Sequence, residues 1–239
     1  MTILFISDLH LEESRPDIAN IFLTFLAHEA KQANALYILG DFFETWIGDD
    51  DLSPFNLSII NALKNAVTGG LPIYIMQGNR DFLLNKKFMH LSGCTLLPDE
   101  HVIDLYGTPT LLMHGDTLCT ADIAYLNARK KYKMWIVQKL ILLKSLEKRR
   151  AMAARMRAAS KARTKTVDTA IMDVTQAEVE RVMKKHSVQH LIHGHTHRLA
   201  VHEFLLEGKP ATRTVLGPWH EHGSVLVCDD KGQQNFMIL

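Results

Sequence analysis

Residues 3–10 read ILFISDLH, a short apolar run that ends at an acidic residue and a histidine. Two further runs have the same form, ALYILGD at residues 35–41 and PIYIMQGN at residues 72–79. Between them, residues 18–33 and 57–67 carry apolar side chains at the spacing of amphipathic helices. Short apolar strands that alternate with helices predict βαβ units and a parallel sheet buried on both faces.

Polar side chains of ligand type stand where the predicted strands end. Asp8, Asp41 and Asn79 fall at such ends, and ligands of parallel sheets bind beyond the carboxyl ends of the strands. A predicted hairpin at residues 102–113 leads directly to a histidine, and a predicted strand at residues 188–192 leads to HGHTH. The full set of predicted metal ligands is Asp8, His10, Asp41, Asn79, His114, His195 and His197.

The rest of the chain adds a second layer of strands. Residues 175–178, TQAE, form a capping-box pattern that predicts a helix reaching about residue 185. Short strands are predicted at residues 201–206, 213–216, 224–228 and 235–238. No internal repeat and no Pro/Gly/Ser linker divides the sequence. We therefore predict an α/β protein, an α/β/β/α sandwich of two packed sheets with helices outside, in which residues 1–239 form one domain.

Composition changes sharply between residues 121 and 165. This segment has 14 Lys or Arg and two acidic residues, a net charge of +12, and it contains no Gly or Pro. The remainder has 13 basic and 24 acidic residues, a net charge of −11, so the whole chain carries +1. The segment predicts a basic, amphipathic insert of two or more helices, which emerges beside the site. Its apolar stripe is Tyr132, Trp135, Ile136, Leu140, Leu143 and Leu146.

Several protein classes are disfavoured by composition. The three cysteines form no CxxC pair, which argues against a disulfide framework and favours a reducing compartment. The N-terminal apolar run is too short for a signal peptide and ends in Asp8 and His10. Residues 135–146 contain Lys139 and Lys144, so the most apolar stretch is not a membrane-spanning helix.

The spacing of the ligand-type residues distributes them over two cations. Residues i and i+2 of a strand point the same way, so Asp8 and His10 can bind one ion together. The same spacing returns in His195 and His197, on a different loop. Each cation can therefore receive one of these two imidazoles.

Asp41 is the natural bridge, because one carboxylate can span two metals about 3.5–4 Å apart, and Asn79 and His114 would complete the second ion. Two divalent cations and two carboxylates leave a charge of roughly +2, which favours a phosphate or diphosphate substrate over a neutral ester. Arg80 can add a bidentate grip on a phosphate. Asp81 is expected to orient Asn79 or His114.

Five blocks of sequence carry a family resemblance: SDLH, GDFFE, GNRD, MHGD and GHTH. Together, from Ile3 to His197, they resemble the blocks of the calcineurin-like metallophosphoesterases. Arg80 departs from the broad superfamily, which usually has His at that position. GNRDFLL, LMHGDTLCT, a basic insert ending in MRAAS, and LIHGHTHR resemble one narrower family, the bacterial UDP-2,3-diacylglucosamine hydrolases of lipid A synthesis.

This resemblance implies an activity, a cofactor and a location. The family cleaves the diphosphate of UDP-2,3-diacylglucosamine at the UMP phosphorus, releasing UMP and 2,3-diacylglucosamine 1-phosphate. It is Mn²⁺-dependent, so two divalent ions, Mn²⁺, are expected here. It acts at the cytoplasmic face of the inner membrane, which predicts a peripheral membrane protein. The predicted catalytic residues are Asp41, Asn79, Arg80, His114 and His195.

The resemblance also implies substrate contacts. The matching residues are Asn79, Arg80, Asp122, Ser160 and His195. Shortly after Ser160 the family has an Asn and then a Lys, where this chain has Thr164 and Val167, with Lys165 as a candidate replacement. The insert is expected to act as a lid, covering acyl chains with its apolar face and meeting anionic lipid with its lysines.

Alternative interpretations remain open from the sequence. The insert could be a plain helical hairpin or an oligomer interface; nucleic acid is not a predicted partner, because stacking aromatics are not interleaved with its basic residues. Residues 49–51, DDD, are interpreted as a solvated turn, and Asp116 as either a helix cap or a partner of a ligand. The nine histidines outside the ligand set are interpreted as structural. The alternative functions are a soluble phosphodiesterase or phosphatase acting on another nucleotide or a phosphoprotein, and a non-catalytic scaffold of the same fold.

Overall fold

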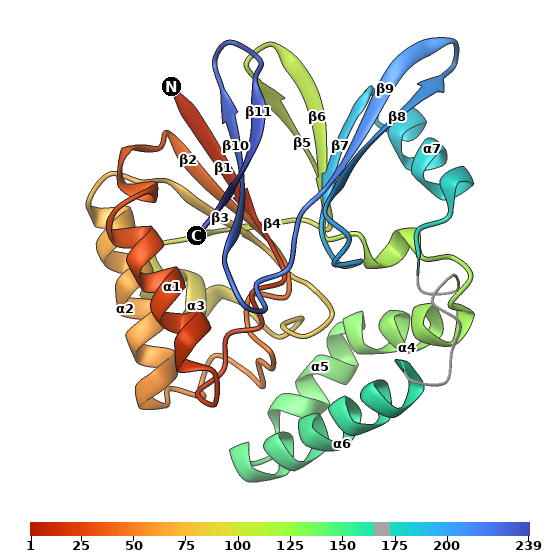
Figure 1. The fold of residues 1–239 in the computed structure, drawn as a ribbon. Coiled ribbons are helices and arrows are strands. Elements are labelled where there is room, and N and C mark those ends of the chain that lie inside the picture. Colours follow the sequence, from red (N-terminus) through yellow and green to blue (C-terminus); the bar gives the residue numbers. More distant parts are fainter. Residues whose placement is uncertain (165–172) are drawn as a thin grey trace.

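The computed structural model describes residues 1–164 and 173–239. Two β-sheets pack face to face, with helices on both outer sides (Figure 1). The first sheet has the strand order β11-β10-β1-β2-β3-β4, and the second has the order β5-β6-β7-β9-β8. The strands are β1 (Thr2–Ile6), β2 (Ala35–Leu39), β3 (Ile73–Met76), β4 (Thr95–Leu97), β5 (Glu100–Leu105), β6 (Thr108–Met113), β7 (His190–His193), β8 (Ala200–Leu206), β9 (Lys209–Val215), β10 (Ser224–Asp229) and β11 (Gln234–Ile238). The predicted α/β/β/α sandwich is thereby confirmed.

The helices divide into an outer set and an insert. The outer helices are α1 (Pro16–Ala27), α2 (Pro54–Thr68), α3 (Lys86–Ser92) and α7 (Gln176–Lys185), with short 3₁₀ helices η1 (Ala30–Gln32) and η2 (Asp116–Leu118). The helices of the insert are α4 (Ile123–Lys133), α5 (Trp135–Leu142) and α6 (Leu146–Thr164). The assignment of residues 1–239 to one domain, with an insert at residues 121–165, stays a prediction.

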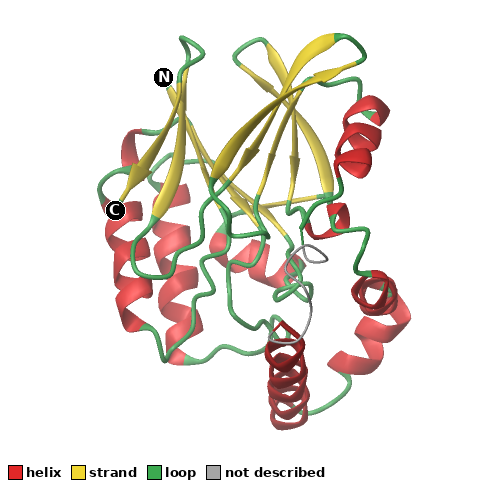
Figure 2. Ribbon diagram, turned by 45° about the vertical axis from the view of Figure 1, so that its right-hand side comes forward, coloured by secondary structure: helices red, strands yellow, loops and turns green. Residues whose placement is uncertain are grey.

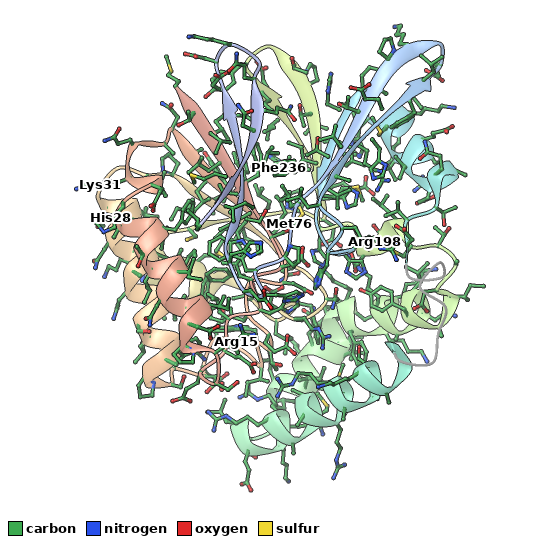
Figure 3. All side chains as sticks on the ribbon, in the orientation of Figure 1. Arg15, His28, Lys31, Met76, Arg198 and Phe236 are labelled. Carbon is green, nitrogen blue, oxygen red and sulfur yellow. The ribbon has the colours of Figure 1, made fainter. Side chains whose placement is uncertain are left out.

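Side chains of β1 show how the sequence builds three layers. Because successive strand residues point to opposite faces, Leu4 and Ile6 pack against the outer helices while Phe5 faces the second sheet. The core between the sheets also contains Met76, which is labelled in Figure 3. Helices α1–α3 cover the first sheet and α7 covers the second (Figures 1 and 2). Each large apolar side chain buried in this way stabilises the fold by about 1.5–3 kcal/mol.

The predicted parallel arrangement places strand ends together. β1 pairs with β2 and β2 with β3 in parallel, and β7 lies parallel between β6 and β9. The carboxyl ends of these strands consequently meet at one edge of the sandwich, on the side of the insert (Figure 1). The predicted ligand residues come directly after these strands in the chain, so they lie at this edge.

Several element boundaries differ from the predictions. The first helix begins earlier, at Pro16, and ends at Ala27, where a 3₁₀ turn takes over. The strand predicted at residues 188–192 is shifted to His190–His193. Helix α3 and strand β4 were not predicted, because each is short. The predicted capping box at α7 is wrong in its bonding: Thr175 precedes the helix, but its hydroxyl accepts a hydrogen bond from Thr120 at 2.7 Å.

The insert has three helices, and its apolar residues face two ways. Tyr132 and Ile141 turn inward, toward the body of the protein, and Ile141 is buried. Trp135 and Leu143 are exposed. Of the apolar stripe predicted from the sequence, Tyr132 packs against the core, whereas Trp135, Ile136, Leu140 and Leu143 are exposed. The breaks at Met134 and after Leu142 redirect the chain between them.

One buried arginine anchors the insert to the first sheet. Arg149 of α6 is 2% exposed and donates hydrogen bonds to the carbonyl of Ile47 at 2.7 Å and to both carboxylate oxygens of Asp50. Next to it, Arg150 pairs with Asp51. The acidic run at residues 49–51 is thus not a solvated turn, as predicted: Asp50 and Asp51 pair with arginines of the insert, and Asp49 accepts hydrogen bonds from the Trp46 indole and from the backbone amides of Asn85 and Phe88.

A second ionic network anchors α4. Arg129 bonds the buried Asp116 and, at 2.9 Å, Asp99. Lys133 lies 2.7 Å from the same Asp99. Asp116 also accepts a hydrogen bond from the Tyr125 hydroxyl. Asp116 is therefore a docking point for the insert, a role not predicted from the sequence, and its charge also helps to raise the pKa of His114, in line with the predicted partner of a ligand.

Candidate metal centre

The predicted ligands lie on loops with an unusual backbone. Eight non-glycine residues have positive φ in the described part of the chain, and five of them belong to the predicted ligand set. These five are Asp8, His10, Asp41, His195 and His197, with φ between 49° and 70°. A non-glycine residue in this region is strained by about 1–3 kcal/mol, and such strain gathers at functional sites. The backbone therefore marks the same edge of the sandwich as the ligand pattern does.

The first cluster consists of Asp8, His10 and His197, whose ligand atoms lie within 4.8 Å of one another. The Nε2 atoms of His10 and His197 are 3.3 Å apart, and Nε2 of His197 is 3.2 Å from Oδ1 of Asp8. The other oxygen of Asp8 accepts hydrogen bonds from the Ser7 hydroxyl and the His195 amide. Oδ1 of Asp8 is thus left buried without a hydrogen bond, and it faces two imidazoles.

The second cluster consists of Asp41, His114 and His195, also within 4.8 Å. His114 donates from Nδ1 to the carbonyl of Leu39 at 2.8 Å, so its Nε2 is free to act as a ligand. That Nε2 is 3.1 Å from Oδ1 of Asn79. An imidazole lone pair and an amide oxygen that face each other this closely fit a shared cation.

Asp41 lies between the two clusters. Its Oδ1 is 3.6 Å from Nε2 of His114, and its Oδ2 is 3.8 Å from Nε2 of His10. The structure therefore brings all seven predicted ligands to one place, and the Asp41 carboxylate faces both clusters. The donor set of carboxylate, amide and imidazole suits first-row divalent cations.

Electrostatics favours positive charge at the centre. Burial alone would raise the pKa of Asp8, but the His197 imidazole, 3.2 Å from its Oδ1, and the nearby His114 hold it well below the ordinary value. Burial would lower the pKa of His114, but the carboxylates of Asp41 and Asp8 raise it to about 9. The buried carboxylates thus stabilise cationic neighbours, protons or metal ions alike.

Two glycines let the ligand loops approach each other. A Cβ at Gly78 would lie 2.2 Å from Oδ1 of Asp41, and a Cβ at Gly194 would lie 2.3 Å from Oδ2 of Asp8. Neither position has room for a side chain. This crowding explains the glycines in the GNRD and GHTH blocks.

Asp81 has a different role from the predicted one. It does not bind Asn79 or His114; its carboxylate accepts the backbone amides of Phe42 at 2.7 Å and Gly78 at 2.6 Å. It therefore ties the loop after β2 to the loop after β3. Burial, together with the charge of Asp41, raises the pKa of Asp81 to about 6.

A cavity of about 190 Å³ opens between the centre and the insert. Its polar lining includes Asn79, Arg80, Arg157 and Ser160. Its apolar walls are Trp46, Ile47, Phe82, Leu83, Tyr132, Ile141, Met152, Ala153 and Met156. Core loops and insert helices each supply part of this wall, so the cavity exists only because the insert is docked.

The other predicted substrate-binding residues do not all line this cavity. Asp122 is the N-cap of α4 and accepts the Tyr125 amide at 2.8 Å; it is not among the lining residues of the cavity. Thr164 is the last residue of α6. Lys165 and Val167 lie outside the described residues.

Three residues beside the centre were missed from the sequence. Glu44 contacts His10, Arg157 contacts Glu44 and lines the cavity, and the Tyr125 ring lies 6.2 Å from that of His195. Glu44 closes the GDFFE block, which was a usable signal. Arg157 and Tyr125 lie in the insert, which contains many other basic and aromatic residues, so the sequence around them did not indicate a functional role. By contrast, His28 lies at the outer side of the helical layer, far from the centre, as its structural interpretation requires (Figure 3).

The described residues contain no helix of sufficient length and apolar character to cross a membrane.

Comparisons with known proteins agree with this geometry. The family described as calcineurin-like phosphoesterase matches residues 1–199. The chain is 51% identical to the UDP-2,3-diacylglucosamine hydrolase of Pseudomonas aeruginosa, over 98% of each chain. It is 54% identical to the protein of that name from Salmonella arizonae, over 95% of this chain and 94% of the other.

Solved structures support the fold. An archaeal phosphodiesterase aligns over 100% of both chains with a TM-score of 0.52 and 14% identity. At that identity the likeness concerns the fold alone. With the family match and the two close relatives, it leads to one conclusion: this chain belongs to the calcineurin-like phosphoesterases and, among them, to the family of the UDP-2,3-diacylglucosamine hydrolases.

Proposed function

We propose that this protein is a metal-dependent hydrolase that cleaves the diphosphate of UDP-2,3-diacylglucosamine to UMP and 2,3-diacylglucosamine 1-phosphate, a step of lipid A synthesis. The names of its relatives support this activity. The observation that carries the proposal is the juxtaposition of two ligand clusters with an apolar cavity. A phosphate-selective centre and an apolar cavity together suit a substrate that is both a diphosphate and a lipid.

The proposed cofactor is a pair of divalent cations, Mn²⁺ in the cell. The residues that would hold them are Asp8, His10, Asp41, Asn79, His114, His195 and His197. Such cations, when bound, neutralise phosphate charge and lower the pKa of water from about 15.7 to about 7. The residues proposed to carry catalysis are Asp41, Asn79, Arg80, His114 and His195.

The protein's own side chains then orient the diphosphate. Arg80 lines the cavity and follows Asn79 in the chain, and its Nε is buried without a hydrogen bond. A guanidinium in this state favours an anionic partner, because an unsatisfied buried donor is costly. Arg157, from α6, lines the same cavity and has the same property. The two arginines thus form a clamp for phosphate oxygens at the mouth of the apolar region.

Acyl chains are proposed to occupy the apolar walls of the cavity, and further contacts to the head group to come from the insert. Together with the centre, the proposed substrate-binding residues are Asn79, Arg80, Asp122, Ser160, Thr164 and His195. A rigid insert, held by Arg129 and Arg149, keeps this surface in place before substrate arrives. Such preorganisation lowers the entropic cost of binding.

Incubation of the purified protein with UDP-2,3-diacylglucosamine and Mn²⁺ tests the activity. We expect release of UMP, measured by chromatography, and much slower release from the deacylated UDP-sugar. Equal turnover of both sugars would instead favour a soluble phosphodiesterase. Absence of bound metal after Mn²⁺ loading would favour a non-catalytic scaffold.

We also propose that the protein is peripheral, bound to the anionic cytoplasmic face of the inner membrane through the insert. The insert patch is Met134, Trp135, Ile136, Leu140, Leu142 and Leu143, all exposed. Around it, the exposed lysines are Lys130, Lys131, Lys139, Lys144 and Lys148, and the Lys139 ammonium lies 5.0 Å from the centroid of the Trp135 ring. Apolar side chains framed by lysines suit an anionic lipid surface.

Substitution of Trp135 and Leu143 by serine is expected to weaken binding to vesicles of phosphatidylglycerol and phosphatidylethanolamine at least about tenfold, because a buried large apolar side chain contributes about 1.5–3 kcal/mol. Co-sedimentation measures the effect. Leu205→Ser provides the control, since Leu205 is 70% exposed on β8, outside the patch. Unchanged binding by the double variant would contradict the role of the patch.

A further inference from the structure

Glu44 stands between the metal centre and the arginine clamp. It lies in the loop after β2, and its side chain is 21% exposed. One carboxylate oxygen, Oε2, is 2.8 Å from Nδ1 of His10. The other, Oε1, is 3.6 Å from Nη1 of Arg157 and 3.9 Å from Nη1 of Arg80. A single side chain therefore contacts a predicted metal ligand and both guanidinium groups.

The contact with Glu44 favours one orientation of the His10 imidazole. His10 points Nε2 into the centre, 3.3 Å from His197 and 3.8 Å from Asp41. Nδ1 of His10 is buried and makes no hydrogen bond of good geometry among the described residues, and the Glu44 carboxylate 2.8 Å away is the charge that faces it. This charge favours a proton on Nδ1 and leaves the Nε2 lone pair for a cation. Outer carboxylates of this kind fix the orientation of a ligand histidine and make it more basic.

On the arginine side, Glu44 supplies a negative charge close to two positive groups. Arg80 and Arg157 come from the loop after β3 and from α6, and both have a buried Nε without a hydrogen bond. Two guanidinium groups that face the same cavity repel each other. An intervening carboxylate offsets this repulsion and sets where the two groups lie before a phosphate arrives.

The backbone of this loop is tied to both neighbours, so the position of Glu44 is defined. Its amide donates to the carbonyl of Leu11 at 3.1 Å, next to His10. Two residues later, the Trp46 amide donates to the carbonyl of Arg80 at 3.2 Å. The loop that contains Glu44 is thus joined by backbone hydrogen bonds to the loop that carries His10 and to the loop that carries Arg80.

We infer that Glu44 is a positioning residue that couples the metal centre to phosphate recognition: one oxygen orients His10 for its cation, and the other holds the Arg80 and Arg157 guanidinium groups apart and in place. The inference rests on the proposed function for its second half. Its first half concerns metal binding alone and can be measured without substrate.

Three variants separate these roles. Glu44→Ala removes both contacts, Glu44→Gln keeps an acceptor for His10 and removes the charge, and Glu12→Gln is the matched control. Glu12 lies 3.5 Å from Arg157, its carboxyl is 36% exposed, and no contact joins it to His10 among the described interactions. Circular dichroism and thermal unfolding establish that each variant is folded.

The first measurement is Mn²⁺ binding to the substrate-free protein, followed by the electron paramagnetic resonance signal of free Mn²⁺. Glu44→Ala is expected to weaken one of two binding events by about 10–100-fold, the usual effect of losing such a partner. Glu44→Gln should recover most of this loss, and Glu12→Gln should bind as the parent protein does. Parent-like Mn²⁺ binding by Glu44→Ala would overturn the orienting role.

The second measurement is the split between KM and kcat for UMP release at saturating Mn²⁺. Glu44→Gln is expected to raise KM about tenfold or more with a smaller change in kcat, because the clamp is disturbed while the centre is loaded. An unchanged KM in Glu44→Gln would overturn the arginine role. If the parent protein binds two Mn²⁺ and releases no UMP, the proposed function fails, whereas the Mn²⁺ titrations still decide the first role.

Discussion

Replacement of Asp41 by asparagine is expected to lower kcat by more than about a thousandfold and to remove most of the bound metal. Loss of an outer partner of a ligand typically costs about 10–100-fold, and Asp41 faces both clusters directly. Its Oδ1 is 3.6 Å from His114 and its Oδ2 is 3.8 Å from His10. Asparagine preserves the shape and the oxygen that accepts the Arg80 amide at 2.8 Å, but it removes the charge that two cations would share.

Metal content by atomic emission and kcat for UMP release measure this effect. Asp104→Asn serves as the control, because Asp104 only accepts a turn amide, that of Gly107, in the β5–β6 hairpin. Alanine at position 41 should have at least as large an effect. Near-normal turnover in Asp41→Asn, with the protein folded, would rule out the bridging role.

Replacement of Ala153 by phenylalanine is expected to slow hydrolysis of the lipid substrate and to leave hydrolysis of a small phosphodiester nearly unchanged. Ala153 of α6 lines the cavity, so a larger side chain there would occupy space proposed for acyl chains. Excluding about four methylene groups from apolar surroundings costs about 3 kcal/mol, or at least about a hundredfold in kcat/KM for UDP-2,3-diacylglucosamine. Hydrolysis of a small phosphodiester should be nearly unchanged, because the ligand loops are untouched.

Ala154→Phe is the matched control, since Ala154 is the next residue of the same helix and is exposed. It should leave both rates unchanged. A parallel loss of both rates in Ala153→Phe would point to a distorted centre and would count against an acyl site in this cavity. An unchanged lipid rate would place the acyl chains elsewhere.

The site was more predictable than most of its surroundings. Asp8, Asp41 and Asn79 could be assigned because parallel strands bring their carboxyl ends to a common edge, whatever the details of packing. The continuous apolar run ILFI likewise predicted a strand buried on both faces, and β1 confirms this, since Leu4 and Ile6 face the helices and Phe5 faces the second sheet. Periodicity is a local property, so the chain reveals it without its partners.

Roles that depend on long-range contacts were not predictable in the same way. Residues 49–51 looked like a solvated acidic turn, yet Asp50 pairs with an arginine 99 residues away. Asp81 looked like a partner of ligand side chains, yet it binds backbone amides of two loops. A carboxylate has many possible donors in the folded chain, and its residue type does not select among them.

By itself, the sequence determined the sandwich, the order of the ligand residues and the chemistry that they favour, because strand and helix periodicity and ligand type are carried by each short segment. Only the tertiary structure decided how the insert is docked, which apolar residues line the cavity and which remain outside, and where Glu44 and Arg157 lie. These features depend on buried charge pairs between distant segments, Arg149 with Asp50 and Arg129 with Asp116. These charge pairs form only when the insert has packed against the body of the protein, so no short segment of sequence reveals them.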